Sequence, residues 1–160
     1  MKAFLIIGNL NAATYKQVFP LIKAGGLRVG YSPITGSRWF EVPSDYDSRY
    51  TKVINGQKCI PIKSVWYTTL DYPKRHKPLQ LTKRYNPTDY PKYDNYDAIE
   101  VGRTKDIPRD YDGVMGVPIS FLDKWCPEQF EIIKFRHGND GRDLAINGKC
   151  PFFRILIKRK

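Results

Sequence analysis

The sequence predicts a mixed α/β fold, with an α/β unit at the N-terminus and a β-rich region after it. Two apolar runs, 2–8 and 27–31, flank a segment with helical spacing. Beyond residue 31, short apolar runs alternate with turn signals, a pattern typical of β-structure. At 160 residues the chain is long enough to bury a core of its own, so we expect 1–160 to form a single domain.

The N-terminal unit begins with a strand. Residues 2–8 form a continuous apolar run, which predicts a strand that is buried on both faces. Residues 11–23 carry apolar side chains at helical spacing, with Asn11 as the N-cap, and Pro20 predicts a kink or a break. Residues 27–31 then form a second strand. A strand, a helix and a strand of these lengths make a βαβ-type unit, which belongs in a parallel or mixed sheet.

The remainder is expected to consist of short strands joined by polar loops. The predicted strands are 39–42, 58–61, 64–70, 98–101, 129–135 and 152–158. Asn55-Gly56 and Asn147-Gly148 are signals for tight hairpin turns. Residues 119–125 offer one more short helix.

The charge balance indicates the class of partner. Lys and Arg number 27 against 16 acidic residues, a formal net charge of +11, which favours a polyanion such as nucleic acid. No run approaches the about 18 apolar residues of a membrane span, so we expect no membrane partner and a cytoplasmic location. The three cysteines show no CxxC spacing, so neither a disulfide framework nor a zinc site is predicted.

An aromatic-basic belt, residues 67–96, is the best candidate surface for such a partner. Its Lys and Arg side chains can hold phosphates, while its Tyr rings can stack on bases or pack against sugars. The competing interpretation is a solvated loop whose tyrosines cover the edge of the core, and the sequence leaves both open. The DNA-binding candidates are Lys74, Arg75, Lys77, Lys83, Arg84, Tyr85, Lys92, Tyr93 and Tyr96.

Signatures of common enzymes are missing. The sequence has no P-loop, GxSxG or HExxH motif and no Asp/Glu-x-Lys element. His76 has no neighbour in the sequence that would make it a metal ligand or a catalytic base. No residue is therefore assigned a catalytic, cofactor-binding or metal-binding role.

The segment 90–121 has an unusual composition. It holds two dense clusters of Tyr and Asp, and each cluster leads into an apolar, strand-like run. We expect the carboxylates of these clusters to orient loops and Arg or Tyr side chains. The segment also carries part of a resemblance to a known family.

The chain resembles the EcoRI-like adenine-specific DNA methyltransferases over nearly its whole length. The matching segments are 4–12, 15–16, 19–23, 66–71, 90–121, 121–124, 129–132, 146–149 and 154–158. The resemblance implies methyl transfer from S-adenosylmethionine to the N6 amine of adenine in duplex DNA, within a restriction-modification system. Such enzymes extrude the target base, because its amine is inaccessible inside the stack.

The resemblance also implies that this chain corresponds to one part of a larger enzyme. Members of the family carry a glycine-rich cofactor turn and an Asn-Pro-Pro-Phe catalytic turn ahead of the segment that matches 4–9, and neither motif occurs here. By this resemblance the chain is the C-terminal portion of such an enzyme. Residues 1–31 end a Rossmann-like catalytic sheet and residues 32–160 form a β-rich DNA-recognition region.

Three functional expectations follow from this resemblance. The isolated chain is expected to be inactive and to bind no S-adenosylmethionine alone. Its expected partners are double-stranded DNA and the N-terminal half of the enzyme. The alternative is a non-enzymatic basic module that binds nucleic acid or another protein.

Overall fold

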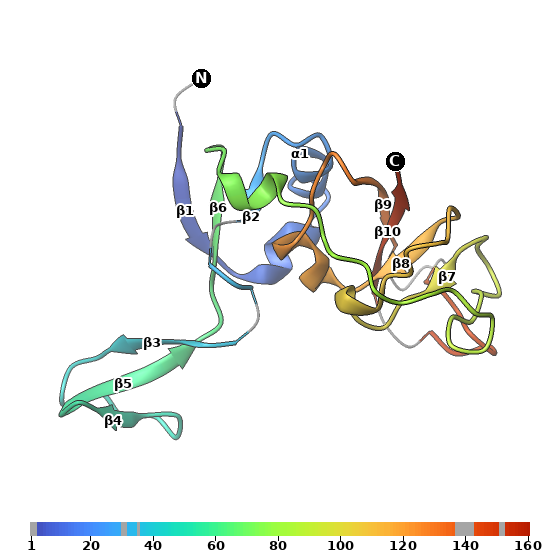
Figure 1. Ribbon diagram of the computed structural model, residues 1–160. Helices are drawn as coiled ribbons and strands as arrows, with labels where there is room; N and C mark the ends of the chain where they lie inside the picture. The colour runs from blue at the N-terminus through green and yellow to red at the C-terminus, as the bar shows by residue number, and fades with distance from the viewer. Residues whose placement is uncertain (1–2, 30–31, 35, 137–142, 151–152) are drawn as a thin grey trace.

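The fold contains three small sheets and few helices. The structure is a computed structural model. It describes residues 3–29, 32–34, 36–136, 143–150 and 153–160. Two of the sheets lie in the body of the molecule, and the third projects from it (Figure 1). The predicted mixed and β-rich character is thus confirmed.

The first sheet joins the two ends of the predicted βαβ-type unit through a third strand. Its order is β1 (Leu5–Gly8), β6 (Val65–Thr68) and β2 (Arg28–Val29). Both β1 and β2 are antiparallel to β6, so they run in the same direction but are not neighbours. The described sheet has three strands with antiparallel pairing, and the expected Rossmann-like sheet is not confirmed.

The prediction that the first strand is buried on both faces is wrong. The side chains of Leu5, Ile6 and Ile7 are 53%, 56% and 52% exposed. The physical reason is position: β1 lies at the edge of its sheet and pairs with β6 along one side. An apolar edge strand of this kind is available for pairing.

The predicted N-terminal helix is broken into two short pieces. The first is a 3₁₀ helix, η1 (Leu10–Thr14), which is capped by the side chain of Asn9 rather than by Asn11. The second is α1 (Phe19–Lys23), in which Pro20 occupies the first turn. Proline is tolerated there because N–H groups in the first turn of a helix have no carbonyl partner within the helix, so the N–H that proline lacks costs no hydrogen bond. The predicted helix is thus interrupted, but at 15–18, ahead of Pro20, which is itself part of α1.

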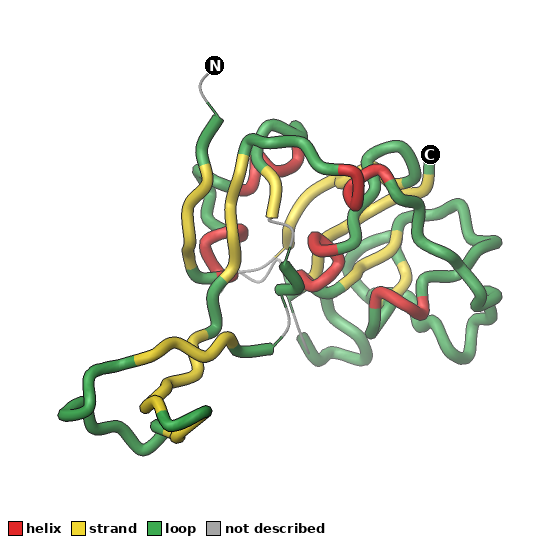
Figure 2. Tube along the Cα trace, turned by 60° about the vertical axis from the view of Figure 1, so that its left-hand side comes forward, coloured by secondary structure: helices red, strands yellow, loops and turns green. Residues whose placement is uncertain are grey.

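The projecting sheet is antiparallel, with the order β3 (Arg38–Glu41), β5 (Gln57–Ile62) and β4 (Lys52–Ile54). It stands apart from the rest of the chain in a second view as well (Figure 2). Asn55 and Gly56 join β4 to β5 with φ angles of 49° and 81°. Positive φ at both positions is what a two-residue hairpin requires, so this predicted turn is confirmed.

The second body sheet has four strands. Its order is β7 (Ile99–Glu100), β8 (Met115–Val117), β10 (Arg154–Arg159) and β9 (Phe130–Arg136). Only the β7–β8 pair is parallel. The predicted strands in this region are confirmed, whereas the predicted helix at 119–125 is the 3₁₀ helix η4 (Ile119–Asp123).

Parts of three predicted strands fall outside the described residues. These parts are Lys2 at the start of the first strand, 30–31 at the end of the second and Phe152 at the start of the last.

One main core serves both body sheets. Phe19 and Ile22 of α1 are buried against the four-stranded sheet, and the rings of Phe19 and Phe135 lie 5.7 Å apart. Ile155 and Ile157 of β10 are fully buried in the same core. In the described part of the chain, no helix has the length and apolar character needed to cross a membrane.

Candidate nucleic-acid interface

Much of the belt lies in the segment 77–98, which we call the extended segment. It leads from η2 (Pro73–His76) to β7 without a helix or strand of its own, with turns and bends at 87–90 and 94–97. Among the described residues its β-pairing is limited to two isolated bridges, at Lys83 and Lys92. The main chain of Lys83 accepts a hydrogen bond from the amide of Arg109 at 3.0 Å. The amide of Tyr85 donates to Asp110 at 2.7 Å. These contacts fix the segment against the body of the protein.

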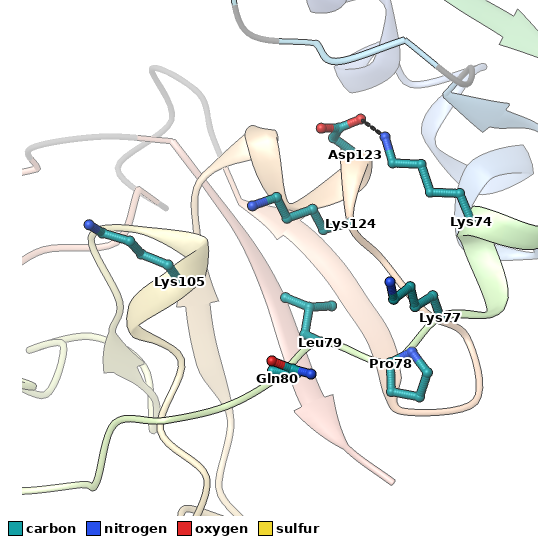
Figure 3. Close-up of a pocket in the computed structure, with 8 residues that line it drawn as sticks. All are labelled: Lys74, Lys77, Pro78, Leu79, Gln80, Lys105, Asp123 and Lys124. Atoms are coloured by element: carbon teal, nitrogen blue, oxygen red, sulfur yellow. Dashed lines mark hydrogen bonds and ion pairs between the residues drawn. The ribbon is translucent and has the colours of Figure 1, made fainter.

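A shallow pocket of about 450 Å³ lies beside the start of this segment (Figure 3). We call it the lysine hollow, and it is lined by Lys74, Lys77, Pro78, Leu79, Gln80, Lys105, Asp123 and Lys124. Its one carboxylate, Asp123, lies 3.2 Å from the ammonium of Lys74. Within the described residues the other three lysines form no ion pair, so the hollow has an excess of positive charge.

A second hollow, of about 360 Å³, lies further along the segment. Its lining residues are Lys83, Arg84, Asp89, Tyr90, Gly102, Arg103 and Asp106. Here Arg103 is paired with Asp106 at 2.8 Å, so the positive excess is smaller. The 3₁₀ helix η3 (Thr104–Asp106) contributes to both hollows, through Lys105 to the first and Asp106 to the second.

The predicted basic residues divide into two groups. Lys74 and Lys77 line the lysine hollow, and Lys83 and Arg84 line the second hollow. Arg75 differs, because it is only 7% exposed and its guanidinium lies 4.7 Å from the ring of Trp125. Burial lowers the pKa of Arg75. Its contacts point into the body of the protein.

Lys92 lies beyond both hollows. It is exposed and stands 3.9 Å from Asp97, which is also exposed.

The predicted aromatic residues contact other protein groups. The ring of Tyr85 lies 4.7 Å from that of Tyr111. Tyr96 lies under the ammonium of Lys134, at 4.7 Å. Tyr93 is 6% exposed and donates a hydrogen bond to Glu100, and burial raises the pKa of its phenol. Tyr93 therefore fits the interpretation that tyrosines cover the core.

The carboxylates of the Tyr/Asp segment orient loops and basic side chains, as predicted. Asp94 accepts a hydrogen bond from the amide of Gly148 at 2.8 Å, and Asp110 holds the amide of Tyr85. Asp112 pairs with Arg159 at 2.5 Å.

Sequence reasoning missed two groups of residues. Lys105 and Lys124 join the lysine hollow from η3 and from the end of η4, and nothing in their local sequence marks them. His76 lies between two carboxylates, 2.8 Å from Asp71 and 2.7 Å from Glu128. The hydrogen bonds to Glu128 and Asp71 raise the pKa of His76. Among the described residues, no cluster of three His, Cys, Asp or Glu side chains could hold a metal ion.

Comparisons with known proteins identify relatives along the whole chain. Type II methyltransferase M.EcoRI from Escherichia coli is 56% identical over 165 residues, which cover 99% of this chain and 51% of the relative. Type II methyltransferase M.MgeORF184P from Mycoplasma genitalium is 33% identical, over 99% of this chain and 57% of the relative. Type II methyltransferase M.MpnI from Mycoplasma pneumoniae is 32% identical over the same shares.

The chain spans about half the length of the curated relatives it matches. In M.EcoRI the matched half is the C-terminal part. No solved structure matches the chain. The family described as "Adenine-specific methyltransferase EcoRI" matches residues 1–160. The chain therefore belongs to the EcoRI family of adenine-specific methyltransferases.

Proposed function

We propose that this chain is the DNA-binding, target-recognition part of a DNA adenine-N6 methyltransferase that uses S-adenosylmethionine. Membership of the family supports the reaction class. The observation that carries the DNA-binding role is the pair of basic hollows along one fixed, extended segment. The lysine hollow is lined by four lysines, and the second hollow is lined by Lys83, Arg84 and Arg103.

The two hollows suit a duplex better than a small ligand. Both are open to solvent, and cationic side chains at two successive places on one segment can contact more than one phosphate of a DNA strand. Lysine and arginine contacts to phosphate position a protein on DNA without reading its sequence. Base recognition then belongs to other surface groups, for which Tyr85, Lys92 and Tyr96 remain candidates.

DNA binding is tested by titrating a fluorescently labelled duplex with the full chain at several salt concentrations. The logarithm of the association constant should fall linearly with the logarithm of the salt concentration, because bound phosphates release counterions. Replacing Lys74 and Lys77 with Ala should weaken binding and flatten this dependence. A chain that fails to bind duplex DNA at low salt would contradict the DNA-binding role.

The proposed partner is a protein segment equivalent to the other half of the relatives. The exposed edge strand β1 supports this proposal, because its apolar side chains lie beside an apolar pocket of about 160 Å³. That pocket is lined by Phe4, Ile6, Gly8, Ala12, Val18, Leu27 and Tyr67. An apolar strand with a free edge and a neighbouring cavity fits an additional strand or helix from that half.

Methyl transfer should require both halves. The isolated chain, mixed with labelled S-adenosylmethionine and duplex DNA, should transfer no methyl group to adenine. Adding the N-terminal half of M.EcoRI should restore transfer to the adenine N6 position. Turnover by the isolated chain would contradict the proposed division. DNA binding with no activity in the mixture would favour a non-enzymatic binding module.

A further inference from the structure

We infer that the lysine hollow binds one backbone phosphate of the DNA. This inference rests on the proposed function and assigns a specific contact within it. It also adds Lys124 and Lys105 to the interface, although both lie outside the belt. The chemistry that the hollow recognises is a phosphate oxyanion, whether it belongs to a DNA strand or to a free phosphate.

Leu79, which lines the hollow, is held in place by the side chain of Gln129. The amide of Leu79 donates to the Gln129 Oε1 atom at 2.7 Å, and Gln129 Nε2 donates to the carbonyl of Leu79 at 3.0 Å. This two-way clamp holds the extended segment against the residue that precedes β9. The hollow is therefore a formed feature of the fold, with lysines placed around a fixed floor.

The lysines reach the hollow from three separate elements. Lys74 lies in η2 and is held by Asp123 of η4 at 3.2 Å. Lys77 and Lys124 are exposed and lie near Leu79, with Lys124 above it and Lys77 to its right in Figure 3. Lys105 stands at the far rim in the same view. Four lysines from several elements line the hollow against one carboxylate, and this local excess of positive charge favours an anion.

The lining favours a phosphate over a base or a carboxylate-bearing peptide. Among the described residues that line the hollow none is aromatic, so they offer no ring on which a base could stack. Lysine acts as a compact point charge with freely turning donors, which suits a phosphate without fixing its orientation. Arginine forks, which match a carboxylate in two-point contact, are absent from the lining.

The test compares two double variants of the full chain that lose the same charge. One is Lys77→Ala with Lys124→Ala in the hollow, and the control is Lys16→Ala with Lys63→Ala at exposed sites outside both hollows. The hollow variant should weaken binding equally for different duplex sequences and reduce the salt slope by about 1. The control should leave the slope unchanged. Equal slopes for the hollow variant and the wild type would overturn the inference.

A second measurement separates the hollow from the proposed function. Inorganic phosphate, added to the isotopically labelled chain, should shift the NMR amide signals of Leu79 and Gln80, and the hollow variant should lose these shifts. Such shifts without any duplex binding would keep the anion site but contradict the DNA-binding role. Phosphate shifts together with an unaltered salt slope in the hollow variant would overturn the assignment to DNA.

Discussion

At the scale of single residues, the four-stranded sheet contains a buried ion pair, between Arg154 and Glu100, that the sequence does not predict. Arg154 of β10 and Glu100 of β7 have side chains only 8% and 14% exposed, and they pair at 2.5 Å. The hydroxyl of Tyr93 donates to the same carboxylate. Glu100 and Arg154 lie far apart in the sequence, and β8, which pairs with both of their strands, brings them together. Tyr93, which the sequence offered as a DNA contact, is thus part of an internal network.

Glu100→Ala should be strongly destabilising. It leaves the buried guanidinium of Arg154 without its carboxylate, a change that costs about 3–5 kcal/mol in comparable buried pairs. Urea denaturation measures the free energy of unfolding. Glu131→Ala, at an exposed position on the neighbouring strand β9, removes the same charge and should have little effect. A loss as small as that of the control would contradict the importance of the pair.

Gly116→Ala should disturb the same network from the opposite side. A Cβ atom at Gly116 would clash with the hydroxyl oxygen of Tyr93, so the phenol would have to move away from Glu100. Overpacking of this kind costs about 1–3 kcal/mol, which thermal or urea unfolding can measure. Gly102→Ala is the matched control, because a Cβ atom there meets nothing within 4 Å. Equal stability of the two variants would show that the Tyr93 phenol can move away without lowering the free energy of unfolding.

At the scale of elements, strands were more predictable than helices. β5, β9 and β10 follow from their apolar and β-branched runs, and the φ angles at Asn55-Gly56 follow from the residue types. The helices are shorter than their patterns predict. Pro20 is accommodated only in the first turn of a helix, so α1 begins at Phe19, and short apolar spacing does not distinguish 3₁₀ from α geometry.

The cluster around His76 ties η2 to the residues that precede β9 and should make stability depend on pH. Its hydrogen bonds to Glu128 and Asp71 raise the pKa of His76 above the usual 6.5. The contribution of His76 is therefore complete below about pH 6.5 and is lost as the pH rises through the raised pKa. Hydrogen bonds from Cys126 and His76 lower the pKa of Glu128 to about 2. Its contribution is complete above its usual pKa of about 4.5 and is lost as the pH falls toward 2.

The His76→Gln variant should therefore lose more stability, relative to wild type, at about pH 5.5 than at about pH 9. Urea denaturation at the two pH values gives the comparison. Lys77→Gln removes a neighbouring positive charge that makes no ion pair within the described residues, so its effect should vary little over this range. A His76→Gln effect that is the same at both pH values would rule out a contribution from the charged imidazole.

At the scale of the whole molecule, positive charge and exposed apolar surface occupy different places. The two basic hollows lie along the extended segment, whereas the exposed apolar side chains of β1 lie at the edge of the other body sheet. The sequence predicted the belt and its basic character because Lys, Arg and Tyr are dense there. It could not predict the hollows, since Lys105 and Lys124 come from separate 3₁₀ helices and only the fold brings them to Lys74.

The exposed β1 edge should make the isolated chain self-associate. Leu5 and Ile7 lie on the same face of an edge strand and are 53% and 52% exposed, so two copies can pair edge to edge and pack these side chains beside those of the added strand. Sedimentation velocity should detect dimers or larger species that increase with concentration. The double variant Leu5→Lys with Ile7→Lys should shift the population toward monomer, because charges on an edge strand oppose pairing.

The same double variant also separates self-association from recognition of the proposed partner half. Gln17→Lys, at an exposed position away from β1, controls for added positive charge and should leave association unchanged. If β1 is the surface that receives the partner half, the lysine pair should abolish methyl transfer in the two-half mixture while duplex binding by the isolated chain is retained. A wild-type chain that stays monomeric at every concentration would contradict edge pairing between copies. Full methyl transfer with the lysine pair would place the partner elsewhere.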